Sequence, residues 1–186
     1  MKITHLLFLM VLSAFAACGD DDGGSGDPNL LSYDGNNASA PELGAGIHEL
    51  AIYFPAKDLQ SRIGKKLHEV EVYVDQGASY YKIKIHGPGT ATSPGPVIET
   101  VDFTNQVNAR KWAIVDVGPI EITGEDLWIA VEVLHAQTAQ TIGCDSGPRK
   151  DGGDWIWSSD VNQWQSFLGR TGTESVNWNI RGHLID

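Results

Sequence analysis

The strongest constraint on the fold is a short-range alternation of apolar and polar residues that turn-forming residues interrupt repeatedly. From residue 68 to 75, Val70, Val72 and Val74 share one face of an extended chain. A period of two residues is that of a β-strand with one buried face. Similar segments recur between Gly, Pro, Asn and Asp residues, which predicts an all-β chain.

The alternation predicts strands at 47–54, 68–75, 79–86, 97–103, 111–117, 126–134, 155–158 and 176–185. Segment 126–134 is apolar at nearly every position except Glu132, so we expect it in the middle of a sheet. The number and spacing of the strands favour a two-sheet antiparallel sandwich of jelly-roll type. One short helix is expected near 55–63, with Leu59 and Ile63 on one face.

Segments 68–75 and 79–86 are separated by a short turn, which predicts a hairpin. The tightest pairing that keeps both apolar faces together sets Glu71 opposite Lys82 and Glu69 opposite Lys84. Opposite charges across the strands would stabilise this hairpin by roughly a few tenths of a kcal/mol.

Residues 1–17 have the pattern of an export signal. Lys2 provides a positive start, and residues 6–17 are apolar and uncharged. This run is shorter than the roughly 20 residues that span a bilayer, and it predicts a signal peptide. Phe15-Ala16-Ala17-Cys18 resembles a lipobox, which implies lipidation of Cys18, for example with palmitate. The alternative is ordinary cleavage after Ala14-Phe15-Ala16.

Residues 18–29 form an acidic, glycine-rich stretch with almost nothing apolar to bury, which predicts a flexible tether before one domain at 30–186. A cysteine followed by an aspartate run resembles the surface-export signal of Bacteroidota lipoproteins. The resemblance implies an outer-membrane lipoprotein that faces the cell exterior; the alternative is a solvated linker without an address.

The charge balance restricts the possible partners. The formal net charge is −11, and removal of residues 1–17 takes away Lys2 and no acid. Such a domain is repelled by nucleic acid and by anionic membranes, so we expect contact with a membrane through the lipid only. Lipidation of Cys18 would leave Cys144 as the one remaining cysteine, which predicts a small buried hydrophobe and no disulfide.

Calcium is the one metal for which the sequence permits a binding site. The six histidines contain no pair at zinc-binding spacing. Asp145, Asp151 and Asp154 fall in one glycine-rich stretch and offer the oxygen ligands that calcium prefers. The sequence therefore permits a calcium site there, although no cofactor is required. The alternative is an acidic surface loop.

The six tryptophans divide into two groups. Trp112, Trp128 and Trp178 lie within predicted strands and are expected in the core. Trp155, Trp157 and Trp164 flank polar loops, and the first two are two residues apart on one face. Exposed aromatic rings bind sugars or protein partners, so these three are the candidate ligand-binding residues. The alternative is that they cover the end of the sandwich.

Several phrases in order are similar to β-sandwich modules appended to secreted adhesins and peptidases of Bacteroidota. They are Leu31-Ser32-Tyr33-Asp34, Asp126-Leu127-Trp128-Ile129-Ala130, Gly143-Cys144-Asp145-Ser146-Gly147-Pro148, Gly153-Asp154-Trp155-Ile156 and Asn177-Trp178-Asn179-Ile180-Arg181. The resemblance implies the fold and an extracellular setting, and it implies no catalytic residue.

The sequence therefore predicts a non-catalytic, surface-displayed module that binds a glycan or an extracellular protein. Asp145-Ser146-Gly147 is similar to the serine phrase of trypsin-like proteases, but no Ala-His-Cys phrase provides the general base. The alternatives are a structural accessory subunit of a surface complex and, with less support, a hydrolase.

Overall fold

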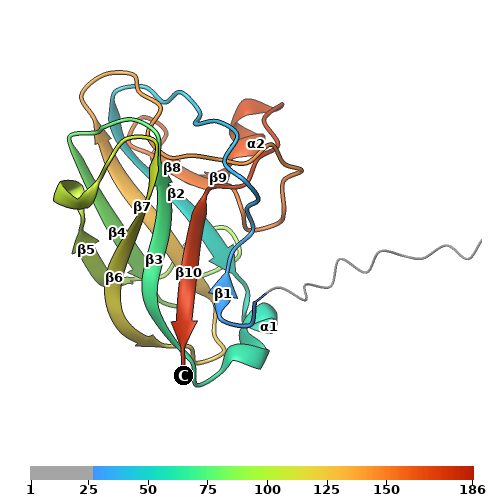
Figure 1. The fold of residues 1–186 in the computed structure, drawn as a ribbon. Coiled ribbons are helices and arrows are strands. Elements are labelled where there is room, and N and C mark those ends of the chain that lie inside the picture. Colours follow the sequence, from blue (N-terminus) through green and yellow to red (C-terminus); the bar gives the residue numbers. More distant parts are fainter. Residues whose placement is uncertain (1–26) are drawn as a thin grey trace, which may run out of the picture.

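Two antiparallel sheets contain all the strands of the computed structural model, which describes residues 27–186 (Figure 1). They pack face to face, which confirms the predicted two-sheet sandwich. The predicted signal peptide, Cys18 and most of the predicted tether lie outside the described residues. No helix in the described part of the chain is long and apolar enough to span a membrane.

The four-stranded sheet has the order β1 (Leu30–Leu31), β10 (Ile180–Ile185), β3 (Lys66–Val74) and β6 (Lys111–Glu121). The six-stranded sheet has the order β5 (Val97–Asp102), β4 (Tyr80–His86), β7 (Leu127–His135), β2 (Gly46–Phe54), β8 (Trp155–Ser158) and β9 (Trp164–Ser166). The helices are α1 (Ala56–Leu59) and α2 (Phe167–Thr171), with 3₁₀ turns η1 (Gln60–Arg62) and η2 (Thr104–Gln106). Helices α1 and α2 lie at opposite ends of the sandwich (Figure 1).

Strand β7 occupies the middle of the six-stranded sheet, as its apolar sequence predicted. It pairs with β2 from Leu127 to His135 and with β4 from Trp128 to Leu134. Every residue of β7 except Leu134 is buried. Both of its faces are therefore covered, whereas most strands of a sandwich have one face toward solvent.

The main core lies between the two sheets. The valines of β3 face inward from one side, and Ile129, Val131 and Val133 face inward from the other. Cys144 is also fully buried there, as predicted, and burial raises the pKa of its thiol. Trp178 lies in this same core, in agreement with its predicted place.

The predicted hairpin is wrong. Strand β3 pairs with β10 and β6, whereas β4 pairs with β5 and β7 in the other sheet. Both strands bury an apolar face in the same core from opposite sides, so alternation alone cannot distinguish a hairpin from a crossing between sheets. The predicted cross-strand pairs are replaced: Glu71 and Glu69 lie opposite Arg181 and His183, and Lys82 lies opposite Glu132.

Other differences concern short elements and chain ends. The final strand begins at Ile180 rather than at 176, and α1 with η1 ends at Arg62. Leu59 is buried as expected, but Ile63 is 54% exposed, so the two do not share a buried face. β1, β9 and α2 were not predicted, because two to five residues are too few to show a period.

We expect Ile129→Ala to lower the free energy of unfolding by about 3 kcal/mol, because it opens a cavity at the centre of the packed sheets. Ile114→Ala is the control, since Ile114 is 56% exposed and its loss should change stability by less than about 0.5 kcal/mol. Urea unfolding measures both. Equal losses in the two variants would contradict the described core.

Candidate functional site

The outer face of the six-stranded sheet carries an aromatic cluster, here called the tryptophan face. Its members are Tyr53, Trp128, Trp155, Trp157 and Trp164. Along β8 the residues alternate between half-buried Trp155 and Trp157 and buried Ile156 and Ser158. Trp157 lies directly opposite Trp164 of β9. The structure thus brings the three predicted ligand-binding tryptophans to one face.

Trp128 is at the centre of this cluster. Its ring centroid lies 4.7 Å from that of Tyr53, 5.3 Å from that of Trp155 and 5.6 Å from that of Trp164. Trp128 is fully buried, as predicted, but on the outer face of the sheet rather than between the sheets. Contacts of this geometry add stability beyond the area that they bury.

The prediction for Trp112 is wrong, because this residue is only half-buried. It alternates with the inward-facing residues of β6 and therefore lies on the outer face of the four-stranded sheet. The Arg181 guanidinium lies 4.1 Å from its ring centroid, a cation–π contact.

A charged group adjoins the tryptophan face. Glu49 and Glu132 lie directly opposite each other on β2 and β7, and the Lys84 ammonium contacts both carboxylates, at 2.7 Å in the case of Glu49. Burial raises the pKa of Glu49, but His86 and Lys84 lower it by more, so this pKa is below its usual value. The lysine therefore holds two like charges side by side at the middle of the sheet.

Beside these rings is a cavity of about 240 Å³, here called the Trp155 hollow. It is lined by Tyr53, Pro55, Lys57, Asp58, Ala91, Arg149, Asp151, Gly152 and Trp155. Gly152 has φ +96°, and a Cβ there would come within 2.3 Å of the Tyr53 carbonyl oxygen. Only glycine allows this close approach, in which the Tyr53 N–H donates to the Gly152 carbonyl at 2.8 Å.

The rim of the Trp155 hollow carries both charge signs. Arg149 donates from Nη1 to Asp151 and from Nε to buried Asp154, each at 2.7 Å. Lys57 and Asp58 are exposed on α1. Aromatic walls with a few polar groups of fixed position are typical of a small-molecule binding site.

The structure does not gather the three aspartates predicted to bind calcium into one cluster. The Asp145 carboxylate accepts hydrogen bonds from the backbone N–H groups of Gly35, Gly147 and Asn177 and from Asn177 Nδ2. Asp154 pairs with Arg149, and Asp151 faces the Trp155 hollow. Across residues 27–186, no three His, Cys, Asp or Glu side chains are grouped to hold a metal ion.

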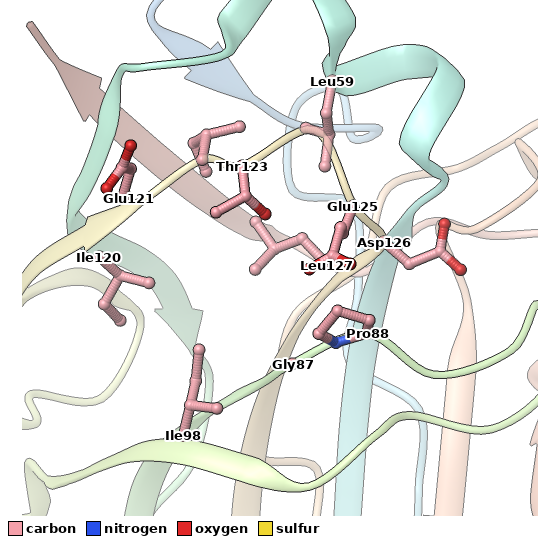
Figure 2. A pocket seen from close by; sticks show the side chains of 11 residues that line it. Leu59, Gly87, Pro88, Ile98, Ile120, Glu121, Thr123, Glu125, Asp126 and Leu127 are labelled. Carbon is pink, nitrogen blue, oxygen red and sulfur yellow. The ribbon is translucent and has the colours of Figure 1, made fainter.

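A second cavity, here called the edge pocket, has a volume of about 160 Å³ and lies where β5 approaches the end of β6. Figure 2 shows Pro88, Ile98, Ile120 and Leu127 around it. Sequence reasoning missed both cavities, because their linings come from segments that are distant in the chain. The proximity of these segments is a property of the tertiary structure, so no local pattern in the sequence indicates it.

The chain matches no family model and no curated protein. Among solved structures it is similar to the clostridial cysteine protease Cwp84 after propeptide cleavage, with a TM-score of 0.59 and 11% identity over 86% of this chain and 41% of that one. It is also similar to a structure of the cysteine protease and lectin-like domains of Cwp84, a surface layer associated protein of Clostridium difficile. Here the TM-score is 0.61 and the identity 12%, over 86% of this chain and 36% of the other. The chain thus spans less than half of either structure, and the likeness shows the fold alone.

We expect Asp145→Ala to lower the free energy of unfolding by about 3 kcal/mol, because it leaves buried N–H donors without an acceptor. Asp151→Ala should have almost no effect, since the Asp151 side chain is fully exposed. Thermal unfolding measures both variants, and Asp145→Ala should be the less stable of the two with millimolar calcium and also with chelator. A calcium-dependent stabilisation that Asp151→Ala abolishes would restore the calcium hypothesis.

Proposed function

We propose that this chain is a cell-surface lipoprotein whose β-sandwich is a non-catalytic module that binds a glycan in the Trp155 hollow. The observation that carries the proposal is the combination of Trp155 and Tyr53 with charged side chains around one cavity. A sugar ring has an apolar face of C–H groups and a rim of hydroxyls. It therefore suits a site with aromatic walls and a polar rim.

The rigidity of the walls supports this role. Tyr53 is held by its hydroxyl, which donates to Asp126 at 3.2 Å, and by the backbone bond to Gly152. Trp155 is packed against Trp128, which is fully buried. Side chains that are already fixed lose little freedom on binding, so more of the contact energy remains as affinity.

The comparisons give coarser support. One similar structure contains the lectin-like domain of a surface layer associated protein, together with its cysteine protease domain. The likeness lies in the part outside the protease. A module of this fold beside a separate catalytic domain is consistent with a binding role for the same fold here. We take an extracellular protein as the alternative ligand of the same face.

The proposed location follows from the N-terminal sequence, which lies outside the described residues. Cys18 would carry the lipid, and the acidic residues that follow it would direct the domain to the cell exterior. We expect Cys18→Ser to abolish incorporation of labelled palmitate and to release the chain from the membrane fraction. Cys144→Ser is the control and should retain both. Unchanged labelling of Cys18→Ser would refute lipidation at this residue.

We expect Trp155→Ala and Trp164→Ala to weaken glycan binding at least about tenfold, because Trp155 lines the hollow and Trp164 packs against Trp128 on the same tryptophan face. A glycan array probed with the detergent-extracted full chain, followed by calorimetry on the best hit, measures the loss. Trp112→Ala removes an equal ring from the opposite sheet and should bind as the unmodified chain does.

An array without any hit would contradict the glycan proposal. Extracellular proteins would then be tested on the same variants. Co-purification of one fixed partner from envelope extracts would favour an accessory subunit of a surface complex.

A further inference from the structure

Strand β5 has an edge without a partner strand. Within residues 27–186 it pairs with β4 alone, at the outside of the six-stranded sheet. The Phe103 N–H donates to the Tyr81 carbonyl, so odd-numbered residues on this strand face β4 by the alternation of an antiparallel ladder. Thr100 therefore directs its backbone groups away from the sheet. The alternation does not extend to Ile98, because the register shifts between Glu99 and Val97. The Thr100 N–H donates only to the neighbouring Glu99 carboxylate, at 2.8 Å.

The edge pocket adjoins this strand. Ile98 of β5 is 52% exposed and lines the pocket together with Pro88 and Ile120 (Figure 2). Buried Leu59, Ile122 and Leu127 form its inner wall. An apolar cavity of about 150 Å³ holds a benzene-sized group, so the edge pocket has room for one large apolar side chain.

The rim of the edge pocket is acidic. Glu121 and Glu125 line it and are exposed, and no Lys, Arg or His is among the lining residues. In the described part of the chain, neither glutamate has a cationic side chain within ion-pair distance. Asp126 also lines the pocket, but it accepts hydrogen bonds from Ala56 N and the Tyr53 hydroxyl. Lys66 lies opposite Glu121 in the β3–β6 ladder but forms no ion pair with it, so two exposed carboxylates border an apolar cavity.

We propose that the β5 edge and the edge pocket together dock an extended basic peptide. Its backbone adds a strand to β5, one apolar side chain enters the edge pocket, and flanking Lys or Arg side chains pair with Glu121 and Glu125. Strand addition of this kind takes affinity from main-chain hydrogen bonds and specificity from pockets for alternate side chains. A second copy of this chain is the poorer occupant, because its net charge of −11 places acid against acid.

This site is separate from the proposed glycan site. The two share no lining residue, and the segment from Gly87 to Ala91 passes from one to the other. The peptide proposal does not rest on the glycan proposal, and each can fail without the other.

The test is fluorescence anisotropy of a labelled nonapeptide, Lys-Ser-Lys-Ser-Leu-Ser-Lys-Ser-Lys, with the full chain, because its Lys and Leu side chains share one face of an extended strand. We expect saturable binding that weakens with added salt, and no binding of the same peptide with Glu in place of Lys. Glu121→Gln with Glu125→Gln should weaken binding about fivefold, since two exposed ion pairs are lost. Glu42→Gln with Glu174→Gln removes equal charge from exposed positions outside the edge pocket and should leave the affinity unchanged.

Thr100→Pro tests the strand edge. Proline removes one outward N–H and is tolerated where that group faces solvent, so the melting temperature should stay near that of the unmodified chain. Binding should fall more than about tenfold.

The proposal would be overturned if the basic peptide failed to bind or if the acidic peptide bound equally well. Full affinity in both Thr100→Pro and the Glu121→Gln, Glu125→Gln variant would also overturn it. Self-association of the chain that Thr100→Pro abolishes would overturn it in favour of a second copy.

Discussion

The structure depends on the burial of β7 on both of its faces. Its inward face packs against the four-stranded sheet through Ile129, Val131 and Val133. Its outward face is covered by side chains, because residues 27–186 place no third layer of secondary structure there. Trp128 is covered by Tyr53, Trp155 and Trp164, and Glu132 is paired with Lys84. The fold therefore needs aromatic rings and ion pairs to cover a face that is usually exposed to solvent in a sandwich.

The candidate glycan site lies beside the aromatic residues that cover the outer face of β7. Ala51 and Ala130 are fully buried next to each other on β2 and β7, and Ala51 lies opposite Trp155. Small residues here leave space for the Trp155 ring to lie against Trp128. The outer part of the same ring remains available at the Trp155 hollow. Trp155 thus contributes both to stability and to the proposed binding surface. Because it is packed against Trp128, this wall of the hollow is rigid.

The buried aspartate side chains are matched by hydrogen-bond donors. The Asp145 carboxylate accepts four hydrogen bonds from Gly35, Gly147 and Asn177, which lower its pKa by more than burial raises it. The Asp34 side chain is fully buried and pairs with Arg181 at 2.9 Å. These contacts fasten the segment after β1 to the C-terminal part of the chain. A buried carboxylate is tolerated only with such donors, so these aspartates contribute to the stability of the fold.

The sequence by itself determined the longer strands, the central place of β7 and the common face of Trp155 and Trp157, since each follows from a local pattern of apolar residues. It did not determine which strands pair. The hairpin of 68–75 with 79–86 satisfied every local rule, but β3 and β4 belong to opposite sheets, because an apolar face can be buried equally well from either side. The Trp155 hollow, the edge pocket and the partners of each aspartate were decided by the tertiary structure. They depend on contacts between residues as distant as Gly35 and Asp145, whose approach is set by sheet packing and by no property of their neighbours in the chain.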